Sequence, residues 1–156
     1  MAEIRILRER VVEAPPDLVY DCIADYTNHH GNILPKEFSD LKVESGPGRG
    51  QGTRISFKMT MGGQTRSALA DITEPEPGRV LVESDPNTGI KTVFTVEPAN
   101  GGSRVRFDTS WRPRGFQGLI ERLMARRLLE PVYDRELEQL ERYARSRMAA
   151  GQGQVS

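Results

Sequence analysis

The spacing of the hydrophobic residues changes near Pro113, and this change constrains the fold more than any other feature. Before Pro113, short segments alternate between apolar and polar side chains, which is typical of strands. After it, apolar residues recur about every 3.6 positions from Phe116 to Tyr143, which is typical of a helix. We therefore expect a long C-terminal helix from about Phe116 to Arg147, kinked at Pro131 because proline disrupts a helix interior.

The N-terminal segment contains a second change of period. Residues Glu3–Val12 alternate loosely and predict a strand, and the stretch EAPPDLVYDCIADY follows directly. Its two prolines suit the first turn of a helix, where a missing N–H has no intrahelical partner. We expect a helix from Pro16 to about Tyr26, then a turn-rich stretch, TNHHGNILPKEF, with one short helix.

The middle of the chain predicts a run of strands separated by short turns, GPGRGQG, MGGQ, EPEPG, DPNTG and PANGG. Parallel strands need a crossover of about a dozen residues or more, so these connections predict antiparallel hairpins. The expected strands are Asp40–Ser45, Thr53–Met61, Thr65–Thr73, Arg79–Ser84, Ile90–Glu97 and Arg104–Trp111.

These strands have two different faces. Apolar residues alternate with polar ones at Ile55, Phe57 and Met59 and again at Val105 and Phe107. One face of the sheet should therefore be covered by other elements, and the opposite face should be exposed to solvent. Only the C-terminal helix is long enough to cover such a sheet. The sequence therefore predicts an α+β fold with an apolar space between a curved sheet and this helix, closed at one end by the helix that begins at Pro16.

Length and composition set further limits. The chain has 156 residues and suits one domain, which we expect over residues 1–148 with a disordered tail at 149–156. Lysine plus arginine number 22 and aspartate plus glutamate also number 22, so no excess positive charge favours nucleic acid as a partner. A single cysteine excludes an internal disulfide, and no apolar run suits a signal peptide or a membrane span. We expect a cytoplasmic protein, monomeric or homodimeric.

Several segments resemble one known superfamily. The stretches VVEAPPDLVYDCIADY, GQGTRISF, ITEPEPGRVLVES, TVFTVEPANGGSRVRFDTSW and LEQLERYARSR are similar to the START-like superfamily, the polyketide cyclase/dehydrase and lipid-transport (SRPBCC) group, over residues 3 to 147. The resemblance implies a helix-grip fold, in which a seven-stranded antiparallel sheet wraps around a long C-terminal helix over an apolar cavity. Members of this group include lipid carriers, aromatic cyclases, coenzyme Q-binding proteins and chaperone activators, and a shared fold does not choose among them.

The expected function is binding or transport of a hydrophobic small molecule such as a lipid, a polyketide or an isoprenoid, without a cofactor. The alternative is a polyketide cyclase or dehydratase that uses the same cavity, and a coenzyme Q-binding or chaperone-activator-like interaction module is a weaker one. An enzyme should place at least two titratable groups inward, and none is obvious in the sequence. Adaptable apolar pockets use sulfur and aromatic side chains. The expected cavity lining is Tyr26, Ile55, Phe57, Met59, Phe94, Phe107, Trp111, Leu119, Leu123 and Met124.

The two histidines, His29 and His30, are adjacent in the loop after the first helix. One of them could act as a general base, since histidine titrates near neutral pH, and the loop could be a lid that closes over a substrate. Neither a metal-binding spacing nor a nearby cysteine accompanies them, so we expect no metal. The simplest interpretation is a solvated loop pair that ligand binding does not need.

Overall fold

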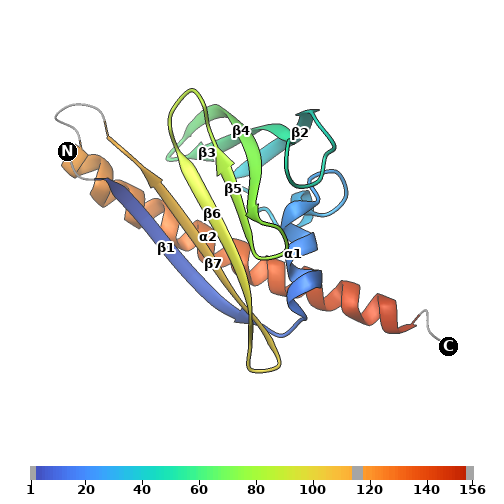
Figure 1. Ribbon diagram of the computed structural model, residues 1–156. Helices are drawn as coiled ribbons and strands as arrows, with labels where there is room; N and C mark the ends of the chain where they lie inside the picture. Colours follow the sequence, from blue (N-terminus) through green and yellow to red (C-terminus); the bar gives the residue numbers. More distant parts are fainter. Residues whose placement is uncertain (1–2, 114–117, 154–156) are drawn as a thin grey trace.

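The computed structural model describes residues 3–113 and 118–153, and within the last segment the side chains of residues 125–151. It consists of one antiparallel sheet, a short helix α1 (Pro16–Ala24), a single turn η1 (His30–Asn32) and a long helix α2 (Gly118–Gly153) (Figure 1). The strands are β1 (Ile4–Val12), β2 (Phe38–Ser45), β3 (Arg54–Met61), β4 (Gln64–Glu76), β5 (Val80–Ser84), β6 (Lys91–Ala99) and β7 (Gly102–Trp111).

The sheet has seven strands in the order β1-β7-β6-β5-β4-β3-β2, and every neighbouring pair is antiparallel. Strands adjacent in the sheet are therefore hairpin neighbours, except that β1 pairs with the last strand, β7. The predicted strands and their antiparallel pairing are confirmed, as is the α+β helix-grip fold. Short turns dictate most of this topology because they leave no length for a crossover.

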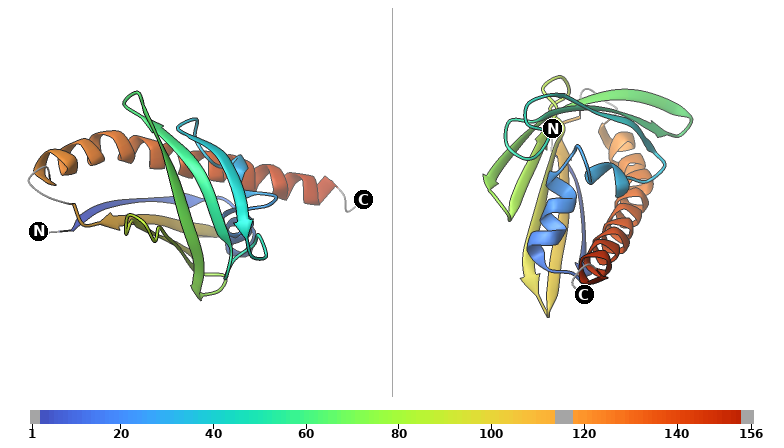
Figure 2. Two further views of the ribbon diagram at one scale, coloured as in Figure 1. Left: turned by 90° about the horizontal axis from the view of Figure 1, so that it is seen from above. Right: turned by 90° about the vertical axis from the view of Figure 1, so that its right-hand side faces the viewer.

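Helix α2 runs along one face of the twisted sheet, and the strands curve around it (Figure 2). It forms a single helix across Pro131 and extends to Gly153. Residues 149–153, which we expected to belong to a disordered tail, are therefore helical, while residues 154–156 lie outside the described part of the chain. The composition GQG gives little intrinsic helix propensity, so continuation of the preceding helix outweighs local preference here.

The space between the sheet and α2 is filled at one end and hollow at the other. Helix α1 lies between the strands and the second half of α2 (Figure 2). Its buried Val19 and Ile23 pack in one core with Val105 of β7 and with Leu137 and Leu140 of α2. The prediction that this helix closes one end of the space is therefore confirmed.

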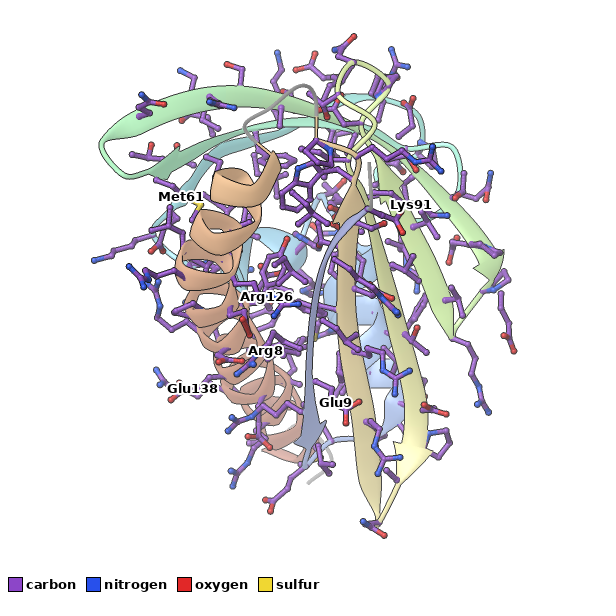
Figure 3. The ribbon with its side chains drawn as sticks, turned by 90° about the vertical axis from the view of Figure 1, so that its left-hand side faces the viewer. Arg8, Glu9, Met61, Lys91, Arg126 and Glu138 are labelled. Atoms are coloured by element: carbon purple, nitrogen blue, oxygen red, sulfur yellow. The ribbon has the colours of Figure 1, made fainter. Side chains whose placement is uncertain are left out.

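The edge strand β1 is attached to α2 by charged side chains. Arg8 forms two hydrogen bonds to Asp134, at 2.8 and 2.6 Å, and a third to Glu130 at 2.9 Å. Farther along β1, Arg10 bonds to Glu141 at 2.8 Å. Figure 3 shows Arg8 between β1 and α2. A planar guanidinium binds a carboxylate through two parallel bonds, so these contacts fix the position of α2 against this edge.

Candidate functional site

A cavity of about 260 Å³ lies between the sheet and α2. Strands β2 to β7, the loop before β2, the loop after β5, the η1 segment and α2 all contribute residues to it. Well-packed interiors rarely contain voids larger than a water molecule, so a cavity of this size is a candidate binding site. The lining residues are His30, Leu34, Phe38, Leu41, Ile55, Phe57, Met59, Arg66, Ser67, Ala68, Leu69, Ala70, Glu83, Asp85, Thr88, Ile90, Thr92, Phe94, Phe107, Tyr133 and Glu136.

The walls of the cavity are mostly apolar, and they include Ile55, Phe57, Met59, Phe94 and Phe107 from the predicted set. The rings of Phe94 and Phe107 meet edge to face with centroids 4.8 Å apart. Strict alternation along β3 brings its three residues to the same face, which the sequence pattern predicted. These five side chains remain a prediction as ligand contacts.

Two other predicted lining residues, Tyr26 and Trp111, are not part of the cavity lining. Tyr26 is buried beneath the cavity, and its phenol bonds to Glu83. Trp111 borders a separate depression with Lys91 and Arg112. Because Trp111 lies at the end of β7, beyond the cavity, it is poorly placed to report on a ligand there. The last three predicted residues have side chains outside the described part of the structure; they are Leu119, Leu123 and Met124.

One part of the cavity is polar, although the sequence pattern predicts an apolar inner face. The phenol of Tyr26 donates a 2.6 Å hydrogen bond to Oε1 of Glu83, and Nε2 of His30 lies 3.9 Å from the same oxygen. Glu136, from α2, lines the same cavity and is only 3% exposed. The expectation of an inner face without obvious acid–base groups is therefore wrong.

His30 is buried rather than solvated, which corrects the interpretation of the histidine pair. Its Nδ1 lies 2.6 Å from the carbonyl oxygen of Ile23, and its ring stacks on Tyr26 with centroids 4.4 Å apart. Burial lowers the pKa of His30 to about 4, so the ring is neutral at pH 7. Nδ1 must then carry the proton that it donates to Ile23, which leaves Nε2 as an acceptor facing Glu83.

His29 is half-buried and points toward α2 instead. Its Nδ1 is 2.7 Å from the hydroxyl of Tyr143, and its Nε2 is 3.8 Å from Asp21 and 4.0 Å from Asp25. The carboxylate of Asp25 caps the exit of α1 by accepting from the backbone N–H groups of Thr27 and Asn28. The adjacent histidines thus have different surroundings, and only His30 belongs to the cavity.

The two cavity glutamates have raised pKa values. Burial raises the pKa of Glu83 to about 7, although the hydrogen bond from Tyr26 opposes this shift. Burial and the nearby negative charge of Glu83 raise the pKa of Glu136 well above its ordinary value. Two carboxyl groups that share one apolar space cannot both ionise easily. Both carboxyl groups therefore favour their neutral form in the cavity, and the pKa of Glu83 lies near 7.

The hydroxyl group of Tyr133, which also lines the cavity, already has a hydrogen-bond partner. The hydroxyl oxygen of Tyr133 lies 2.7 Å from that of Thr109, which lies 2.8 Å from that of Thr92. Burial raises the pKa of Tyr133, so it stays neutral. This chain of hydroxyl groups holds Tyr133 at the cavity wall, next to Phe107.

Glu83 and Glu136 were missed although each carries a signal. On α2, Glu136 occupies the helical face that Val132, Tyr133 and Leu140 define, and a lone glutamate on an apolar stripe is unusual. On β5, Glu83 is two positions after the buried Leu81 and so shares its face. A charged residue on a face that is predicted to point inward therefore indicates an acid–base group in the cavity.

The described residues contain no group of three His, Cys, Asp or Glu side chains that could hold a metal ion. No helix in the described part of the chain has a segment long and apolar enough to cross a membrane.

Comparison with known families shows which family this chain belongs to. Residues 3–145 match the family described as polyketide cyclase / dehydrase and lipid transport. The chain belongs to this family. No curated protein matches the chain significantly.

Solved structures of this family's fold resemble the chain over nearly its full length. The solution structure of KanY protein is 27% identical, with a TM-score of 0.81 over 93% of this chain and 99% of that chain. A Streptomyces sp. R1128 aromatase/cyclase, Zhui, is 17% identical, with a TM-score of 0.68 over 94% of this chain and 96% of that one. The di-domain aromatase/cyclase StfQ of steffimycin biosynthesis is 16% identical, with a TM-score of 0.75 over 94% of this chain and 52% of that chain. The two cyclases support the fold alone.

Proposed function

We propose that this protein binds a hydrophobic small molecule, such as a lipid, a polyketide or an isoprenoid, in the cavity between the sheet and α2, and carries it. The observation that supports this proposal most directly is the cavity of about 260 Å³ with its aromatic and aliphatic walls. Ligand pockets typically measure about 300–1,000 Å³ and are mainly apolar with a few polar groups. A cavity near the lower limit of that range suits a compact ligand.

A neutral fluorescent dye is the appropriate probe because the cavity contains carboxyl groups that would repel an anionic one. N-phenyl-1-naphthylamine should bind the native protein at about one site with roughly micromolar affinity, the range expected for a small apolar ligand. Phe57→Asp places a charge on the cavity wall and should weaken dye binding at least tenfold.

Thr60→Asp is the matched control, because Thr60 lies on the same strand and is exposed on the opposite face. This variant should bind the dye as tightly as the native protein does. Equal binding by the Phe57→Asp protein, or no dye binding by the native protein, would contradict the proposed function.

A second candidate, a cyclase or dehydratase, is favoured by one specific observation. The cavity brings together Glu83, Glu136 and His30, whose pKa values are displaced in different directions. Such separation is what acid–base catalysis requires. In a dehydration, the Glu83 carboxylate would take a proton from the carbon next to a carbonyl group. The protonated Glu136 would give its proton to a departing β-hydroxyl, so that a C=C bond and water form.

The two functions are distinguished by turnover. A β-hydroxy ketone that binds the native protein should be dehydrated by an enzyme and returned unchanged by a carrier. Glu83→Gln removes the proton acceptor and should abolish dehydration without loss of dye binding. The earlier prediction that His29 and His30 are dispensable for ligand binding is tested in the same assay with their single alanine variants.

A further inference from the structure

Glu136 is a buried acidic side chain of the cavity without a hydrogen-bond partner among the described residues. It is 3% exposed, and no described residue forms a hydrogen bond or an ion pair with its carboxyl group. Buried carboxylates are normally paired with a cation or with several donors, because removing an ionised group from water is costly. Both oxygens of Glu136 are thus available to a molecule in the cavity.

The groups around Glu136 add further acceptors but few donors. The phenolic hydrogen of Tyr26 is used by Oε1 of Glu83, and Nδ1 of His30 is used by the carbonyl of Ile23. This leaves Oε2 of Glu83 and Nε2 of His30 without a hydrogen-bond partner among the described residues. In this polar region, counting described residues alone, acceptors without partners therefore outnumber donors without partners.

No cation of the protein compensates the two glutamates within the described residues. Among the described residues, Arg66 is the only arginine that lines the cavity, and it is exposed and pairs with neither glutamate. In the part of the chain that the structure describes, the titratable groups that line this space are His30, Glu83, Asp85, Tyr133, Glu136 and Arg66, and Tyr26 bonds to Glu83 from outside the lining. Asp85 is engaged in its own turn, where it accepts from the N–H of Asn87.

A ligand with a positive charge and several donors would satisfy these groups together. An ammonium group carries three donors and one charge, and aromatic faces such as those of Phe94 and Phe107 also attract cations. We propose that the cavity takes an apolar molecule that carries a protonated amine, with its ammonium group placed between Glu83 and Glu136. This inference rests on the proposed function, and it names the class of the ligand.

The test compares two probes that share one ring system, 1-naphthylmethylamine and 1-naphthylmethanol, by titration calorimetry at pH 7. The amine should bind at least about tenfold more tightly than the alcohol, since a charge-assisted bond is worth roughly twice a neutral one. Binding of the amine should also release about one proton, because the ammonium favours the ionised form of the glutamates. Repeating the titration in buffers of different ionisation enthalpy measures this release.

Glu136→Gln keeps the shape of the side chain and removes its ability to ionise when the ammonium binds. This variant should lose most of the preference for the amine while its affinity for the alcohol changes little. Glu76→Gln is the matched control, since Glu76 is exposed on β4 and does not line the cavity. It should retain the full preference and the proton release.

The outcomes separate this inference from the function on which it rests. If the neutral dye binds but the alcohol binds as well as the amine, or the amine does not bind, the inference is overturned and the proposed function stands. If neither probe nor the dye binds, both fail. A preference for the amine that survives in Glu136→Gln would also overturn the assignment. Dye binding by each variant verifies that its cavity is intact.

Discussion

Nε2 of His30 lies 3.9 Å from Oε1 of Glu83 inside the cavity, and burial displaces the pKa values of these two side chains in opposite directions. The pKa of His30 falls to about 4 from 6.5, and that of Glu83 rises to about 7 from 4.5. In both cases the folded protein favours the neutral form, because a charged group loses its hydration there. The pair therefore influences stability in opposite ways as the pH changes.

The first prediction concerns Glu83→Gln. As the pH rises from 4.5 to 7, the unfolded chain releases the proton of Glu83 while the folded protein retains it, so stability falls. As the pH falls from 6.5 to 4, the unfolded chain protonates His30 first, so stability falls in that direction too. Between pH 4.5 and 6.5, Glu83 makes the free energy of unfolding fall as the pH rises, and His30 makes it increase.

Glu83→Gln should remove the pH dependence of stability that Glu83 causes and leave the one that His30 causes. Above pH 4.5 the free energy of unfolding of this variant should exceed that of the native protein by an amount that grows with pH, reaching on the order of 3 kcal/mol at pH 7. Urea unfolding at several pH values between about 4.5 and 7.5 measures the difference. An unchanged pH profile would show that the carboxyl group of Glu83 does not titrate as inferred.

The second prediction concerns Glu136→Gln. The pKa of Glu136 is raised by burial and by the charge of Glu83, so its contribution to stability also falls as the pH rises above 4.5. The glutamine variant should be more stable than the native protein, and the advantage should be larger at pH 8 than at pH 5. Glu138→Gln, at a side chain 49% exposed on the same helix, should change stability by less than about 0.5 kcal/mol at either pH.

A third prediction compares two glycines with similar backbone angles. Gly48 has φ of +82° and Gly63 has φ of +78°. Both alanine variants should be strained, at a cost of about 1–3 kcal/mol, but a Cβ at Gly48 would also collide with the side chain of Thr27. Nothing lies near a Cβ at Gly63.

Gly48→Ala should therefore lower the midpoint of thermal unfolding more than Gly63→Ala does. The carbonyl of Gly48 also accepts the N–H of Tyr26, so the collision disturbs the loop that holds the end of α1. Equal losses in the two variants would mean that Thr27 moves aside without cost.

The fourth prediction is that Tyr143→Phe loosens the loop that contains the histidines. The hydroxyl of Tyr143 contacts Nδ1 of His29 at 2.7 Å and accepts from the side-chain amide of Asn32 at 3.3 Å. Loss of both bonds should cost about 1–2 kcal/mol of unfolding free energy. Hydrogen exchange of residues 27–33 should become faster, whereas Ser146→Ala, one turn along α2, should leave it unchanged. Unaltered exchange in Tyr143→Phe would contradict this role.

The sequence by itself determined the order of the elements and the faces of the strands. These properties are local, because turn residues such as Gly62 and Gly63 limit the chain to hairpins and because alternation sends Ile55 and Phe57 to one side. The length and spacing of the final apolar run similarly determined α2. Alternation along the strands also gave five apolar residues of the cavity wall, but it did not place Tyr26 and Trp111 outside that wall.

Only the tertiary structure decided what lies at the polar part of the cavity. Whether Glu136 is solvated or buried depends on how α2 is rotated against strands that are distant in the sequence, and periodicity alone does not give that rotation. Whether His30 is a loop residue or a cavity residue depends on the bond from its Nδ1 to Ile23 and on its stacking with Tyr26. The pKa of a side chain follows from its hydration and its neighbours in space. Those are set by the packing of the whole chain, so the acid–base character of this site could emerge only from the folded protein.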